Sequence, residues 1–165
     1  MSFRSVNEID KFSFEDCVLT KIVQESTGLC LELEALIVRP ANSQNTNYTE
    51  SYAGPTSAHL TDCKILAAVK EGYRYLDAND NPVEEIPDCS LSAEETEALL
   101  KRAPGCYLFA MELMEEKDGV CTYQLALEFP NDDVYDTSAT ETYRLTVSFT
   151  KAEFTWQFYM NRVQR

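Results

Sequence analysis

The stretch FEDCVLTKIVQESTGLCLELEALIV, residues 14–38, is typical of two antiparallel strands joined by a tight turn at residues 26–28. On the second strand, apolar side chains occupy every second position: Leu29, Leu31, Leu33, Ala35 and Ile37. Cys30, Glu32 and Glu34 fall between them. Because successive side chains of a strand point to opposite faces, the pattern predicts one buried face and one acidic, solvated face.

Residues 106–116 and 120–129 show the same alternation on either side of residues 117–119. A three-residue loop with Gly119 in the left-handed conformation would align Leu113 with Tyr123 and Met111 with Leu125 on one face. A two-residue loop would separate these apolar sets, because a shift of one residue turns every side chain over. The pattern therefore favours the longer loop.

Residues 142–149 and 154–160 form a third pair of alternating stretches. A loop at residues 150–153 would join them into a hairpin with these apolar pairs on one face: Phe149 with Phe154, Val147 with Trp156, Leu145 with Phe158 and Tyr143 with Met160. Aromatic and β-branched pairs of this kind each contribute about 0.2–1 kcal/mol. We therefore predict that the two strands are neighbours and face the core together.

The segments between these pairs predict a further strand, a short hairpin and a helix. Residues 59–70 are expected as one strand with Cys63, Ile65, Ala67 and Val69 on the same face, and residues 73–76 and 83–86 as the hairpin. Ser92 and Glu95 have the spacing of a capping box, which predicts a helix over about 92–103. The predicted fold is α+β and mainly β. It is a single domain, residues 1–165, whose antiparallel hairpins form a sheet, a sandwich or a partly open barrel with one covering helix.

The charge balance restricts the partners of the protein. The chain has 14 basic and 28 acidic residues, a net charge of −14 and a pI near 4.4. This field repels phosphate backbones and anionic lipids, so nucleic acids and membranes are not expected as partners, whereas a basic protein is. The chain contains no apolar run of about 20 residues, and its start, MSFRSVNEID, does not resemble a secretory signal. A cytoplasmic location is therefore expected.

The six cysteines show no metal-binding or redox spacing, because no CxxC motif and no Cys/His cluster occurs. In the first predicted hairpin, Cys17 and Cys30 lie about 25 Å apart. In the second, Cys121 is expected opposite Glu115, which separates it from Cys106. We therefore predict free, mostly buried thiols, and neither a metal nor a cofactor.

Catalytic and calcium-binding patterns are weak. His59, the only histidine, lies about 13 Å from Cys63 if both are on one strand, so the two side chains cannot pair. Residues 77–88, DANDNPVEEIPD, have acidic and amide residues at EF-hand-like spacing. However, Pro82 occupies the position that needs glycine, and a strand-like segment precedes the loop. A plain turn is expected here, and the protein is expected to lack enzymatic activity.

Residues 40–58, PANSQNTNYTESYAGPTSA, contain a single charge in an otherwise acidic chain. Loops of this length without secondary structure are usually binding loops or mobile segments. Tyr48 and Tyr52 among small polar residues have the composition of binding surfaces in which tyrosine supplies the contact area. The segment is therefore the candidate binding loop, and a mobile loop without a role is the alternative.

The stretches FEDCVLTKI and LCLELEALI, with the later FTWQF, resemble small acidic, β-rich bacterial proteins, some of which are immunity proteins encoded beside polymorphic toxins. The resemblance implies a non-enzymatic module that binds and neutralises a basic toxin. We expect these residues to bind the partner: Tyr48, Tyr52, Glu32, Glu34, Glu84 and Glu85. The alternative function is a small-ligand binder or hydrolase with a pocket under the 40–58 loop.

Overall fold

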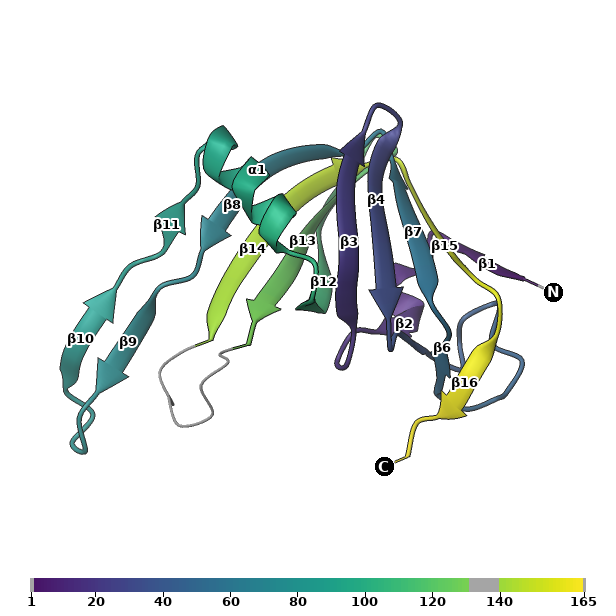
Figure 1. The fold of residues 1–165 in the computed structure, drawn as a ribbon, viewed down its shortest axis with the longest axis horizontal. Helices are drawn as coiled ribbons and strands as arrows, with labels where there is room; N and C mark the ends of the chain where they lie inside the picture. The colour runs from purple at the N-terminus through teal and green to yellow at the C-terminus, as the bar shows by residue number, and fades with distance from the viewer. Residues whose placement is uncertain (1, 131–139, 165) are drawn as a thin grey trace.

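The computed structural model describes residues 2–130 and 140–164, and these are mainly β (Figure 1). The largest unit is a strongly bent antiparallel sheet. Its strands, in spatial order, are β1 (Phe3–Val6), β15 (Lys151–Trp156), β7 (Thr56–Thr61), β4 (Gly28–Glu34), β3 (Val18–Glu25), β12 (Cys106–Lys117), β13 (Val120–Phe129), β14 (Glu141–Phe149), β8 (Lys64–Lys70) and β11 (Cys89–Ser90). This arrangement confirms the predicted fold class.

Smaller elements complete the fold. A second sheet contains β16 (Tyr159–Arg162), β6 (Ser51–Ala53), β5 (Ile37–Val38) and β2 (Phe12–Ser13). The strands β9 (Tyr73–Leu76) and β10 (Pro82–Ile86) form a separate hairpin, which extends from the sheet as an arm (Figure 1). The helices are η1 (Ile9–Lys11) and α1 (Ala93–Arg102). Across residues 2–130 and 140–164, no helix combines the length and the apolar character that crossing a membrane requires.

The first predicted hairpin is confirmed as β3 and β4. Glu25 pairs with Gly28 across the turn, and Leu29, Leu31 and Leu33 are buried. The expected alternation fails at Ala35, which has a left-handed backbone with φ 57°. This residue interrupts the strand, so Leu36 rather than Ala35 is buried and the chain turns into β5.

The second hairpin has the predicted partners but not the predicted loop. Leu113 pairs with Tyr123 and Met111 with Leu125, as expected. The loop is nevertheless a two-residue turn, because Lys117 pairs with Val120. The predicted partners and the shorter turn are compatible because the strand contains one extra residue, Met114, which forms a β-bulge between Leu113 and Glu115. Consequently Cys121 lies opposite Glu116, and not opposite Glu115 as the sequence suggested.

The third predicted hairpin is wrong. β14 pairs with β13 and β8, whereas β15 pairs with β7 and β1. Only Thr150 separates the two strands, so they continue as one bent segment. β7 and β8 likewise form one bent segment, with the bend at residues 62–63. The two bent segments pair on both sides of the bend: Ala152 with Leu60, Lys151 with Thr61, Ser148 with Lys64 and Val147 with Ile65.

The strand predicted over residues 59–70 is therefore divided between β7 and β8. A register shift between Thr146 and Val147 leaves Leu66 of β8 without a partner. Because this bulge reverses the alternation, Ala68 rather than Ala67 is buried. Cys63 lies in the bend and is buried there.

The core contains aromatic side chains from both sheets. The ring of Phe12 on β2 stacks on Phe154 of β15 at 4.7 Å and meets Trp156 edge-on at 5.9 Å. Helix α1 begins as predicted: Ser92 accepts a hydrogen bond from the backbone N–H of Glu95, whose carboxylate accepts one from Ser92. Leu99 of this helix is buried in the same core.

Candidate functional site

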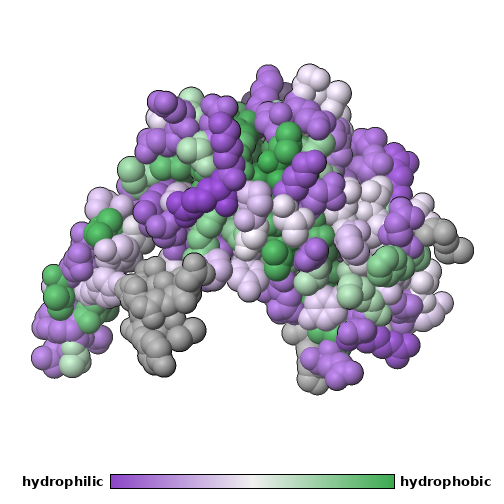
Figure 2. Space-filling model, in the orientation of Figure 1, coloured by the Kyte–Doolittle hydropathy of each residue, from purple (hydrophilic) through white to green (hydrophobic). Residues whose placement is uncertain are grey.

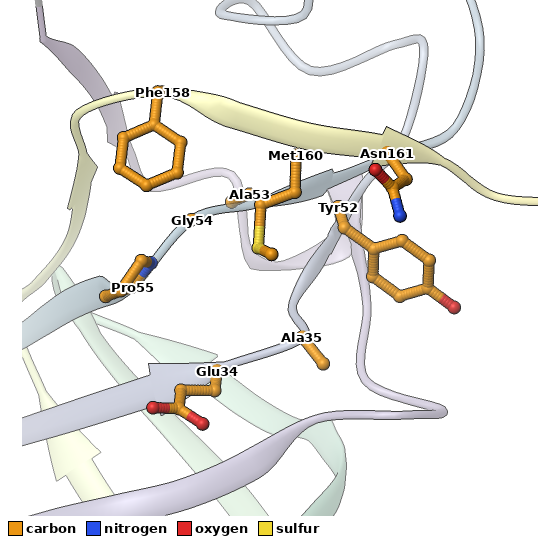
Figure 3. Close-up of a pocket in the computed structure, with 9 residues that line it drawn as sticks. All are labelled: Glu34, Ala35, Tyr52, Ala53, Gly54, Pro55, Phe158, Met160 and Asn161. Atoms are coloured by element: carbon orange, nitrogen blue, oxygen red, sulfur yellow. The ribbon is translucent and has the colours of Figure 1, made fainter.

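The candidate site is an apolar pocket of about 460 Å³ between the end of β4 and the second sheet (Figure 3). Its lining combines the β4–β5 bend, strand β6 with the turn that follows it, and the C-terminal segment: Glu34, Ala35, Tyr52, Ala53, Gly54, Pro55, Phe158, Met160 and Asn161. We call it the end pocket. Residues 52–55 of this lining belong to the 40–58 segment, which the sequence analysis identified as a candidate binding loop.

Backbone contacts hold the C-terminal wall of the pocket. The N–H of Gly54 donates to the carbonyl of Phe158 at 2.8 Å, and Tyr159 pairs with Ala53. The ring of Phe158 covers Gly54 so closely that a Cβ there would lie 2.8 Å from the ring. Figure 3 shows Phe158 and Met160 directed from this wall toward Glu34 and Ala35 on the other side. Their side chains are 53% and 60% exposed, so the apolar wall faces solvent.

The polar groups of the end pocket are few. Glu34 supplies a carboxylate and Asn161 an amide. The hydroxyl of Tyr52 donates to Asp16 Oδ2 at 2.6 Å, which fixes the orientation of the ring. Such a site can hold an apolar group and place a cation against the carboxylate of Glu34.

The structure brings together two of the six expected partner-binding residues, because Glu34 and Tyr52 both line the end pocket. Glu32 points outward on the same face of β4 as Glu34 and accepts a hydrogen bond from Ser57 Oγ at 2.8 Å. Tyr48 is 92% exposed in the preceding loop and does not line the pocket.

Glu84 and Glu85 lie on β10, in the arm at the end of the molecule opposite β6 and β16 (Figure 1). They point to opposite faces of the arm, and Glu85 pairs with Arg74 at 3.5 Å. The arm also exposes apolar side chains such as Val83 and Leu76, and hydrophobic atoms mark its edge in Figure 2. The six expected residues therefore do not form one continuous surface.

The expectation of a loop without secondary structure over residues 40–58 is wrong. Strand β6 and the start of β7 lie within it, and asparagine side chains order the remainder. Asn42 is buried and donates to Ser5 Oγ at 3.1 Å, while its Oδ1 accepts from the Gln44 N–H at 2.9 Å. Asn45 Nδ2 donates to the Val38 and Thr49 carbonyls. The amide-rich composition thus serves the local backbone.

The main residues that the sequence interpretation missed are Phe158 and Met160. Their place in the alternating pattern predicted core positions opposite Leu145 and Tyr143, whereas the structure exposes both beside the end pocket. Residues 150–153 lack the glycine, asparagine or proline of a hairpin turn, and this was the available signal that the two strands separate.

Cys30 and His59 are cross-strand partners, a pairing that the sequence did not suggest. Cys30 lies directly opposite His59 on the outer face of β4 and β7, whereas Cys63 lies beyond the end of β7. The ring nitrogens of His59 contact the Thr27 and Thr61 hydroxyls, and Cys30 Sγ contacts Glu25 Oε2 at 3.4 Å. Burial and the Glu25 carboxylate raise the pKa of the Cys30 thiol, which is the opposite of the activation a nucleophile needs.

The metal-like loop is a plain turn. Asp77 Oδ1 accepts hydrogen bonds from the N–H groups of Asn79 and Asn81, which lower the pKa of this carboxyl. Asp88 instead accepts from the Gly72 N–H at 2.7 Å. In the described ranges no three His, Cys, Asp or Glu side chains are placed to hold a metal ion, and the six cysteines are free thiols.

Comparison of the chain with known protein families, curated proteins and solved structures finds no match. The end pocket is therefore interpreted from its own geometry and charge.

Proposed function

We propose that this chain is a non-enzymatic protein-binding module whose end pocket receives an apolar side chain of a basic partner. The observation that carries the proposal is the exposed pair Phe158 and Met160 beside an apolar pocket. Aromatic residues and methionine are enriched at protein interfaces, and clustered apolar exposure marks interaction sites.

The charges around the end pocket support a basic partner. Glu34 lies in the pocket, Glu32 shares the outer face of β4, and Asp16 accepts a hydrogen bond from the lining residue Tyr52. The net charge of −14 adds a long-range field that attracts a cationic surface and speeds encounter. On the partner, the feature complementary to the end pocket is a leucine or phenylalanine side chain flanked by lysine or arginine.

Neutralisation of a basic toxin is the biological role that we propose for this binding. An immunity-type protein acts by covering a surface of its toxin, and an apolar anchor with an acidic rim is suited to this task. The resemblance in residues 14–22, 29–37 and 154–158 supports this proposed role.

A small apolar ligand is the second candidate for the end pocket. Its volume of about 460 Å³ falls within the range of small-molecule sites, roughly 300–1,000 Å³. A fragment that binds the wild type and not Met160→Ala, with no selectivity for basic peptides, would favour this second function.

Selection of peptides from a random displayed library on the immobilised protein tests the proposal. We expect enrichment of sequences with an apolar residue between basic ones. Met160→Ala should weaken the selected peptides about tenfold, because an apolar anchor at an interface contributes on the order of 1–2 kcal/mol. Glu34→Gln should slow association, and the association rate should fall as salt rises.

Two substitutions serve as matched controls. Met114→Ala removes another exposed methionine, and Glu84→Gln removes a carboxylate on the distant arm. Both should leave peptide binding unchanged. Selected peptides that bind Met160→Ala and Glu34→Gln as tightly as the wild type, or that lack basic residues, would contradict the proposal.

A further inference from the structure

The β-bulge at Met114 gives the β12–β13 hairpin an unusual inner face. Leu113 pairs with Tyr123, and after the bulge Glu116 pairs with Cys121. Directly opposed residues of antiparallel strands point to the same face, and Cys121 shares the face of Tyr123. Without the extra residue, strict alternation would place Glu115 on this face and Glu116 on the other. The bulge therefore turns one carboxylate toward the apolar side of the hairpin.

This face lines a second groove of about 570 Å³, distinct from the end pocket. Tyr123 stacks on Phe149 at 5.3 Å between ring centroids, and Met111 and Leu113 add apolar surface. Glu116 and Asp10 contribute carboxylates. None of the residues lining this groove lines the end pocket.

Negative charge converges on the aromatic part of the groove. Burial raises the pKa of Tyr123, and the charges of Cys121, Asp10 and Glu116 raise it further, so these groups lie close to its hydroxyl. Asp10 pairs with Lys11 at 3.2 Å on the surface. Over the described residues, no cation lies within ion-pair distance of Glu116. The groove thus offers the apolar side chains of Met111 and Leu113, the aromatic ring of Tyr123 and the carboxylate of Glu116, unpaired among the described residues.

We propose that this groove binds an alkylammonium group, a primary amine carried on an apolar stem. The stem lies along Met111, Leu113 and the ring of Tyr123, and the ammonium meets Glu116 and Asp10. Carboxylates and an aromatic face are the two groups that attract such a cation in proteins. A lysine side chain of a protein and a free aliphatic diamine both carry this chemistry.

Cys121 provides a reporter inside the groove, because it lines the groove and is only half-buried. Cys30→Ser and Cys89→Ser remove the other two accessible thiols and leave Cys17, Cys63 and Cys106 buried. Methyl methanethiosulfonate then modifies Cys121: its thiolate attacks the sulfenyl sulfur, a disulfide forms and methanesulfinate leaves. Intact-mass measurements give the rate with and without added amine.

We expect Nα-acetyl-lysine N-methylamide and 1,5-diaminopentane to protect Cys121 in a saturable manner, and the Nε-acetylated lysine amide not to protect it. Glu116→Gln should raise the half-protecting concentration about fivefold, the effect of losing one partly exposed charge contact. Glu115→Gln carries the same charge change on the opposite face and should leave it unchanged. Stronger protection by the lysine amide indicates a protein lysine as the natural ligand, and stronger protection by the diamine a free amine.

Absence of protection at millimolar amine, equal protection by the acetylated compound, or equal effects of Glu116→Gln and Glu115→Gln would overturn the proposal. Circular dichroism of each variant verifies folding before the rates are compared. The end pocket has no part in this measurement, so its outcome is independent of the proposed function.

Discussion

Replacement of Asn42 by alanine tests whether the segment between β5 and β6 is an ordered part of the fold. Asn42 is 3% exposed and links the segment to β1 through Ser5. The substitution removes two hydrogen bonds of about 1 kcal/mol each and leaves the Gln44 N–H without its partner. We expect the free energy of unfolding to fall by about 2–3 kcal/mol.

Urea denaturation followed by tryptophan fluorescence measures this loss, because Trp156 is buried in the adjoining core. With a slope of about 2 kcal/mol per molar urea, the midpoint should move down by about 1 M with the slope unchanged. Tyr48→Ala in the same segment is the control, and its effect should stay within about 0.5 kcal/mol. An equally small effect of Asn42→Ala would refute the view that amide side chains anchor this segment.

Three further predictions concern the backbone, the pH dependence and the thiols. Gly28→Ala should lower the thermal midpoint severely, because φ is 150° and the new Cβ would lie 2.0 Å from the Leu60 carbonyl oxygen, whereas Gly119→Ala, with open space around it, should cost only about 1 kcal/mol in a thermal melt. The Arg4 guanidinium lowers the pKa of Glu153 from 4.5 to about 2, so the stability that this carboxylate adds is present above about pH 4.5 and lost as the pH falls toward 2. Acid titration should therefore destabilise the wild type more than Glu153→Gln over this interval, and parallel curves would contradict the assignment. A thiol reagent should modify three cysteines in the native protein and all six after denaturation, with protection confined to Cys17, Cys63 and Cys106; modification of fewer than six in the unfolded chain would reveal a disulfide.

Local patterns predicted the elements of this fold well where the pairing is also local. The alternation of Leu29, Leu31 and Leu33 identified β4 and its buried face, and the spacing of Ser92 and Glu95 identified the start of α1. In these cases neighbouring residues alone determine the side-chain direction or the cap. The long-range pairs depend on which strand offers a complementary edge, and that information is not local.

The two wrong loop predictions arise from two different irregularities of the strands, a bulge in one case and a bend in the other. Asp118-Gly119 is a favoured two-residue turn, and the structure adopts it with positive φ at both residues. The apolar pattern alone requires a longer loop, but the bulge at Met114 brings the same residues into register with a two-residue turn. Between Phe149 and Lys151 the alternating pattern predicts a loop that joins two paired strands, whereas the chain only bends there and the two strands have different partners.

The candidate site was only partly predictable, because it is formed by strands whose pairing cannot be read from the local sequence. Glu34 and Tyr52 were predicted as binding residues from charge and composition. Both line the end pocket because β5 and β6 pair next to the end of β4. Phe158 and Met160 could not be assigned to the end pocket without the pairing of β16 with β6. A periodic pattern gives the face of a strand, and the partner strand decides whether that face is covered.

The pairing of β1 with β15 joins Phe3 to Trp156 and thereby places the two ends of the chain in adjacent strands. During synthesis, β1 emerges from the ribosome well before β15 and lacks this partner strand until β15 has also emerged. The edge of β7 that later binds β15 is open for the same period, and open edges are sites of intermolecular association. Closure over so many intervening residues makes the contact order high and folding slow. The pairing of β1 with β15 thus forms late in folding, and a chain that stops before β15 leaves both β1 and β7 with unpaired backbone groups.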